Sequence, residues 1–212
     1  MIEYDGAAGA GEEGRMQGSG GRIWRRVRQF VRGVTASVSA EELQLAAQFL
    51  PPAGLARFRQ MPVDAQRHSL NVLSSLQGAG WDDADLAAAA LLHDAGKLAA
   101  AEAGLRFNAW VRTALVLVDA IAPGLAGRLA KEDVKGGWRY LLHVHVTHAR
   151  IGAGWAEADG CSPLTCWLIA QHQDKTGQAE TVLASPGGPE RQRAAEERKR
   201  LLRALQWADS QN

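Results

Sequence analysis

Apolar residues recur at helical intervals through most of the chain, and the segments between them carry residues that begin and end helices. Ser39 followed by Glu42 forms a capping box before the apolar run ELQLAAQFL, and the double proline at 51–52 ends that helix. A short helix is expected next, up to Pro62. The first part of the chain is therefore predicted to be a series of short helices.

The strongest helical pattern follows. Apolar positions over 63–78 describe one helix, and His68 lies in its first turns. Asp82 and Asp83 are expected to cap the next helix, whose run LAAAALL leads to His93. The spacing of these two helices suits an antiparallel pair joined by a Gly- and Asp-containing turn.

Further segments carry the same periodicity. They are a buried helix over 107–121, a helix from near Trp138 to about Gly160, a helix that begins at Pro163, and a last helix from about Glu190 that follows a loop over 176–189. No strand pattern longer than a few residues and no internal repeat is visible. The sequence therefore predicts an all-α fold.

The N-terminal segment differs from the rest. Residues 1–21 are rich in Gly and poor in large apolar groups, so we expect a disordered tail. Residues 22–34 form a basic amphipathic helix, which fits either a first helix packed on the core or an arm that contacts phosphates or a membrane surface. We assign 22–60 to N-terminal helices that pack on the core.

Composition narrows the class of protein. At 212 residues and 46% hydrophobic content, the chain suits a single domain with a substantial core. A net charge of +1 gives no overall field for nucleic acid, so such a partner is disfavoured. Cys161 and Cys166 fit reduced structural thiols. With no apolar run of membrane-spanning length and no signal pattern, a cytoplasmic protein is expected. The oligomeric state is not indicated.

Candidate chemistry begins at LLHDAGK, where His93 and Asp94 stand side by side after a buried helix. Imidazole is a good ligand for transition metals, and an adjacent carboxylate can bind the same ion or bridge to a second. Alone, the pair fits equally a hydrogen-bonded core histidine beside a helix-terminal carboxylate. Other potential ligands lie on or beside apolar helical patterns: His68, His148, His172 and Asp209.

The ordered set of His68, the His93-Asp94 pair and Asp209 resembles the HD superfamily of metal-dependent phosphohydrolases, over about residues 60–210. The resemblance implies a single HD-type helical bundle over 61–212 in which these four residues hold one ion. It also implies that His148 and His172 hold a second ion, with Asp94 bridging the two. The cofactors implied are two divalent ions, from the set Fe, Mn, Zn, Ni, Co or Mg.

The function implied by the resemblance is hydrolysis of a nucleotide or another small phosphoester by a metal-activated water, with Asp94 and Lys97 as catalytic residues. The alternative is a non-catalytic HD module that binds a nucleotide-like ligand for regulation. The chain lacks the double histidine and Gly-Tyr-Pro signature of superfamily branches that cleave cyclic dinucleotides, since Gln171 stands where the first histidine would be. Hydrolysis of cyclic di-GMP is therefore disfavoured.

Several neighbouring residues keep more than one interpretation. His145 is at helical spacing from His148 and fits an alternative ligand or a supporting residue, while His143 would point elsewhere. Asp174 is a candidate for orienting an imidazole. Arg67 and Arg150 adjoin proposed ligands and fit either phosphate contacts or solvated side chains. Gly96 is expected to let the backbone turn away from the site.

Overall fold

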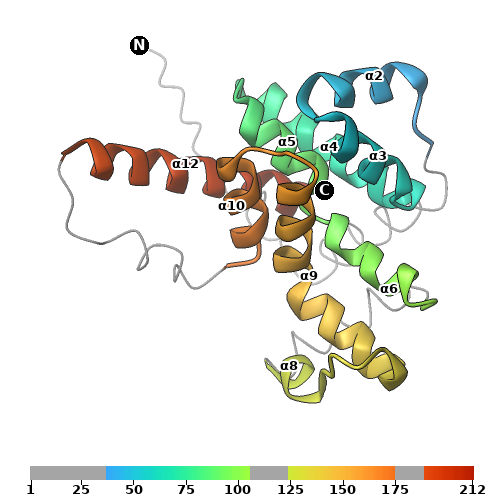
Figure 1. Ribbon diagram of the computed structural model, residues 1–212. Helices are drawn as coiled ribbons and strands as arrows, with labels where there is room; N and C mark the ends of the chain where they lie inside the picture. The colour runs from blue at the N-terminus through green and yellow to red at the C-terminus, as the bar shows by residue number, and fades with distance from the viewer. Residues whose placement is uncertain (1–36, 106–123, 175–188) are drawn as a thin grey trace, which may run out of the picture.

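The described part of the protein, residues 37–105, 124–174 and 189–212 of a computed structural model, is helical throughout and contains no strand (Figure 1). Its elements are α2 (Ala40–Phe49), α3 (Pro52–Gln60), α4 (Val63–Gly78), α5 (Ala84–Leu92), η1 (Ala95–Lys97), α6 (Leu98–Glu102), α8 (Leu125–Leu129), η2 (Val134–Gly136), α9 (Trp138–Ala158), α10 (Pro163–Gln171) and α12 (Pro189–Gln211). The prediction of an all-α fold is confirmed.

Some predicted segments lie outside the described residues. They are the tail over 1–21, the basic helix over 22–34, the buried helix over 107–121, and the loop over 176–189 except for Pro189, which begins α12.

Helix starts follow the capping signals in the sequence. The Ser39 hydroxyl accepts a hydrogen bond from the Glu42 amide, and the Glu42 carboxylate accepts one from the Ser39 amide, so the predicted capping box is present. Asp83 caps α5 by accepting from the amide of Leu86 at 2.8 Å. Each of these bonds joins residues three apart in the chain, which explains why the sequence alone could predict them.

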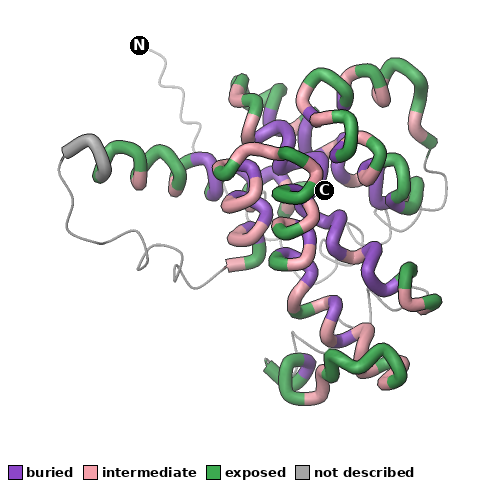
Figure 2. Tube along the Cα trace, viewed as in Figure 1, coloured by how far each residue is buried: buried purple, intermediate pink, exposed green. Residues whose placement is uncertain are grey.

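Helix α5 is the centre of the fold, because every residue from Leu86 to Leu92 is buried. Helices α2, α3, α4, α10 and α12 all pack against it. Its run of alanines has small side chains on every face, which lets neighbouring helices approach closely. Figure 2 shows this inner helix buried among helices that are exposed on their outer faces. The chain that leaves α5 at His93 therefore emerges in the interior.

Helix α12 has two halves of different character. Leu201, Leu202 and Leu205 are buried in the bundle, whereas residues 192–200 are exposed or half-buried. In Figure 1 the first half projects beyond the bundle. The charged first part of the helix is therefore its exposed part, and Asp209 lies in the C-terminal part that packs in the bundle.

Two further predictions concerned the cysteines and the apolar length of the helices. Both cysteines are free, and burial is the main cause that raises the pKa of Cys161 to about 11, so this thiol is protonated at neutral pH. Within the described residues, no helix is both long enough and apolar enough to cross a membrane.

Candidate metal centre

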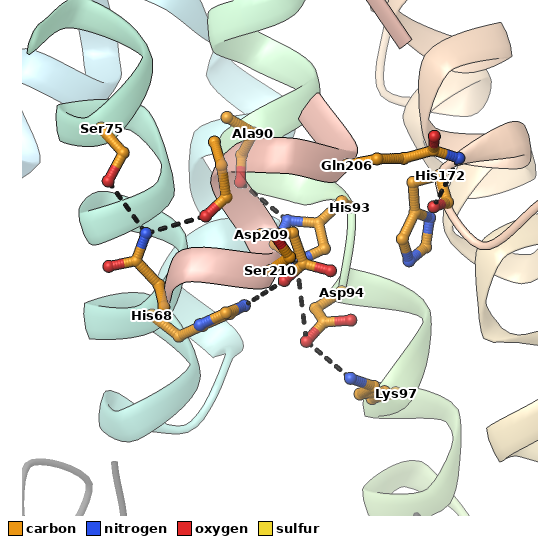
Figure 3. A network of polar contacts seen from close by, with 12 residues as sticks. His68, Ser75, Ala90, His93, Asp94, Lys97, His172, Gln206, Asp209 and Ser210 are labelled. Carbon is orange, nitrogen blue, oxygen red and sulfur yellow. Dashed lines mark hydrogen bonds and ion pairs between the residues drawn. The ribbon is translucent and has the colours of Figure 1, made fainter. Parts of the chain in front are cut away.

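All six residues predicted to be metal ligands meet at one place. Five helices contribute: α4, the end of α5 with the turn after it, α9, the end of α10, and the last turns of α12. Figure 3 labels the side chains from these helices except that of His148 on α9. The residues are His68, His93, Asp94, His148, His172 and Asp209. They span 142 positions of sequence, from 68 to 209, so only the tertiary packing brings them together.

Four imidazoles form a continuous row through the cluster. The ring of His93 lies in the middle, with its centroid 5.3 Å from that of His68 and 5.2 Å from that of His172. The ring of His148 follows, 5.3 Å from that of His172. The rings meet edge to face or tilted, which directs nitrogen atoms toward shared space.

The ligand atoms divide into two groups that share Asp94. Atoms of His68, His93 and Asp94 lie within 4.8 Å of one another, and so do atoms of Asp94, His148 and His172. Asp209 adjoins the first group, because its Oδ1 is 3.0 Å from Nε2 of His68 and 3.6 Å from Nε2 of His93. We call the first group, with Asp209, the open half, and the second group the buried half.

The names reflect solvent exposure. In the open half the side chains of Asp209 and His68 are 38% and 19% exposed, whereas His148 is 1% and His172 7% exposed in the buried half. The shared Asp94 is itself buried. The exposed part of the cluster is therefore the side of Asp209 and His68.

Three of the imidazoles are oriented in the same way by the backbone. The Nδ1 atoms of His93, His148 and His172 lie 2.9, 2.8 and 2.7 Å from carbonyl oxygens three residues earlier in the chain. A carbonyl can only accept, so each Nδ1 carries a hydrogen, and Nε2 of the neutral ring carries a lone pair. In metal-binding histidines, a hydrogen bond from the ring nitrogen that does not bind the metal fixes the tautomer in this way.

Two of these Nε2 atoms, those of His93 and His148, face carboxylate oxygens of Asp94. Nε2 of His148 lies 3.4 Å from Oδ1 of Asp94, and Nε2 of His93 lies 3.8 Å from Oδ2 of Asp94. Within the described part of the chain, the buried Nε2 of His148 has no hydrogen-bond partner. A lone pair beside an anionic oxygen is repulsive unless a cation or proton lies near both. The donor set therefore fits a metal ion, and these buried His and Asp groups could hold one.

Both carboxyl groups of the cluster are held ionised. Burial alone would raise the pKa of Asp94, but Lys97 and His93 outweigh it and hold this pKa well below the ordinary value. For Asp209, burial likewise opposes the shift, and hydrogen bonding from His68 with the proximity of His93 lowers the pKa. The site presents two negative charges.

The pKa values of the imidazoles are shifted in opposite directions. Burial, followed by repulsion from Lys97, lowers the pKa of His148, and burial with the neighbouring imidazoles lowers the pKa of His172 to about 3. For His93, burial would lower the pKa, but Asp94 and Asp209 outweigh it and raise it. The buried half is therefore neutral in its histidines at physiological pH, which is the protonation state that binds metal.

Lys97 lies at the edge of the cluster. Its Nζ is 2.6 Å from Oδ2 of Asp94, and its side chain is half-buried. A residue three positions after Asp94 reaches it because η1 continues the chain as a tight helical turn. The cation is therefore paired with the carboxylate that both ligand groups share.

The other candidates have different roles. His145 supports the site through its backbone carbonyl, which accepts from His148, and the ring of His143 stacks on Tyr140 instead. Arg67 is bound to the Glu42 carboxylate and the Ser37 carbonyl, so it is neither a solvated side chain nor directed at the cluster.

Two further candidates were Arg150 and Asp174. Arg150 is exposed. The Ile169 carbonyl accepts a hydrogen bond from Nδ1 of His172, and the backbone carbonyl of Asp174 accepts one from Gln206.

Two supporting residues escaped the sequence analysis. Gln206 donates through Nε2 to the carbonyls of His172 and Asp174, at 3.3 and 2.9 Å, and so ties the end of α10 to α12. Its only signal was its place one helical turn before Asp209. Gly152 was not distinguished from the other glycines of α9, and its contact with Gly96 is visible only in the folded protein.

Comparisons with known proteins find no match to this chain among family models, curated proteins or solved structures.

Proposed function

We propose that the protein is a metal-dependent phosphohydrolase of the HD superfamily type, acting on a nucleotide or another small phosphoester. The observation that carries the proposal is the convergence of four histidines and two carboxylates into two ligand groups that share Asp94. A carboxylate with two oxygens can hold two ions at the separation used by two-metal hydrolases, about 3.5 to 4 Å.

Each residue has a role in the proposed reaction. His68, His93 and Asp209 would hold one ion, His148 and His172 the other, and Asp94 both. Ions bound there would lower the pKa of a water molecule and offset the charge on phosphoryl oxygens. Lys97 would bind a phosphoryl oxygen of the substrate, since its ammonium lies beside the shared carboxylate and its side chain is partly exposed.

The electrostatics support an anionic substrate only once cations are bound. Asp94 and Asp209 are both ionised, and Lys97 is already paired with Asp94, so the bare cluster would repel phosphate. With two divalent ions the same residues would present a net positive charge. Substrate binding is therefore expected to depend on metal as strongly as turnover does.

The test is turnover of a panel of nucleotides, dinucleoside polyphosphates and simple phosphoesters by protein loaded with Mn²⁺, Fe²⁺, Co²⁺ or Zn²⁺. The Asp94→Asn variant removes a negative charge from the shared ligand and is expected to lower turnover by at least about a thousandfold, equivalent to about 4 kcal/mol of transition-state stabilisation. Arg150→Ala, an exposed change on α9, is the matched control and should turn over as wild type does.

Metal content measured on the same preparations separates the outcomes. About two equivalents in wild type, with turnover that Asp94→Asn abolishes, would support the enzyme. Bound metal without turnover of any phosphoester would favour the non-catalytic, ligand-binding alternative. A wild-type protein that binds no divalent ion would refute the proposal.

A further inference from the structure

A contact between two glycines joins the elements that carry the buried half. Gly96 lies in η1, two residues after Asp94, and Gly152 lies in α9, one helical turn after His148. Both are buried. Backbone therefore meets backbone between η1 and α9.

No side chain fits at Gly96. A Cβ added there would lie 2.0 Å from the carbonyl oxygen of His148 and 2.7 Å from the amide nitrogen of Gly152. Both are backbone atoms of α9, which cannot move aside as a flexible side chain would. Gly96 is not among the glycines with positive φ, so the structural reason for glycine here is close approach, not the freedom to turn that the sequence suggested.

Gly152 adds a third element to the contact. A Cβ there would lie 3.1 Å from the amide nitrogen of Gly96 and 3.4 Å from Cγ2 of Ile169 on α10. Ile169 is the residue whose carbonyl holds the ring of His172. Gly152 thus touches η1 and α10 from within α9, and each of these elements carries or adjoins one ligand of the buried half.

We propose that the Gly96–Gly152 contact is the positioning device of the buried half, setting the distances among Asp94, His148 and His172. The inference rests on the proposed function, in that a metal ion is the group these ligands would hold. Separating η1 from α9 moves Asp94 away from His148, whose atoms now stand 3.4 Å apart. The ligands that only the open half uses include His68 on α4 and Asp209 on α12, and no atom of these two helices is among the nearest neighbours of a Cβ added at either glycine.

The experiment is titration of metal-stripped full-length protein with Co²⁺, followed by calorimetry and by the visible absorption of bound cobalt. Gly152→Ala is the principal variant, because its Cβ meets its nearest neighbour at 3.1 Å and asks for a small shift. Gly154→Ala is the matched control: it lies two residues further along α9, where an added Cβ meets nothing within 4 Å. Alanine is the better helix former at either position.

Wild type and Gly154→Ala are expected to bind two equivalents alike. In Gly152→Ala one equivalent should weaken by about 10- to 100-fold, the range seen when residues that support metal ligands are changed, while the other is retained. Gly96→Ala should weaken the same equivalent at least as much. The helical circular dichroism of the metal-free Gly152→Ala protein should match that of wild type.

Each remaining outcome would overturn one claim. Two unchanged equivalents in Gly152→Ala would overturn the positioning inference and leave the proposed function standing, as would equal weakening of both equivalents. Unfolding of metal-free Gly152→Ala would also overturn it, since the contact would then maintain the whole fold. A wild type that binds no Co²⁺ would instead refute the proposed function.

Discussion

The open and buried halves of the cluster share Asp94 and differ in how their other ligands are satisfied. In the open half, Asp209 accepts a hydrogen bond from His68 and both side chains reach solvent. In the buried half, the neutral imidazoles of His148 and His172 are turned by backbone carbonyls toward Asp94, and Nε2 of His148 is left with no hydrogen-bond partner among the described residues. The exclusive ligands of the open half partly satisfy each other, whereas a cation would complete the buried half.

This difference in exposure and hydrogen bonding predicts different roles for the two halves. Exposed ligands that can bind each other or water tolerate exchange, so the open half suits the face where substrate and water enter. Ligands that are buried and already oriented lose little freedom when an ion binds. We therefore expect the buried half to have the stricter geometry and the greater sensitivity to change.

The largest effect should follow from adding metal to the stripped protein. Two ionised carboxylates and at least one unsatisfied imidazole nitrogen are stabilised when a divalent ion binds the folded state. At free ion a thousandfold above its Kd, the gain is about 4 kcal/mol, or roughly 8 to 16 °C in Tm for a chain of this length. Differential scanning calorimetry with chelator and with excess Mn²⁺ or Zn²⁺ measures it. The shift should be smaller in Asp94→Asn, which lacks the carboxylate that both halves share, and an unchanged Tm in wild type would contradict both halves as metal sites.

A smaller effect should separate the halves. His148→Ala leaves two ligands in the buried half, whereas His68→Ala leaves three in the open half: His93, Asp94 and Asp209. We expect His148→Ala to weaken one metal equivalent by more than about 100-fold, beyond the range for supporting residues, and His68→Ala to have a lesser effect.

Elemental analysis after dialysis, with His143→Ala as a control histidine on the same helix, makes the comparison. Equal losses in His148→Ala and His68→Ala would show that the two halves do not differ.

The smallest effect concerns pH in the metal-free protein. The folded-state pKa of His172 is about 3, below its ordinary value of 6.5, so between these values the unfolded chain binds more protons than the folded one. Stability should therefore fall as pH drops below 6.5, with at most about 1.4 kcal/mol per pH unit from this group. His148 adds to the trend, and His93, whose pKa is raised, opposes it.

Urea unfolding of wild type and His172→Gln in chelator, at about pH 7 and about pH 5, isolates the contribution of His172. The variant should lose less stability on acidification than wild type does. An identical loss in both proteins would mean that the neutral state of His172 does not matter for folding.

Local features of the sequence were predictable because their physics is local. The capping box at Ser39 and Glu42 and the cap at Asp83 join residues three positions apart. Pro163 begins a helix as predicted, because its fixed φ suits the first helical position, and the double proline at 51–52 ends α2 as predicted. The candidate ligands were selected by their order along the chain and by their places beside apolar helical runs.

Other features required the fold. Nothing in the spacing of Arg67 and Glu42, 25 residues apart, marks them as an ion pair, and so Arg67 remained a candidate for phosphate. Support from the carbonyls of Ala90, His145 and Ile169 depends on ring orientation, which sequence does not contain.

The sequence by itself determined the helices and their caps, because propensity and capping act within a few residues. It also determined which residues are candidate metal ligands. Tertiary structure alone decided that those groups form two halves around one carboxylate, that one half is buried, and that Gly96 must lack a side chain. These are consequences of how α9, α10 and α12 pack around the end of α5, and packing distances depend on partners far away in the chain.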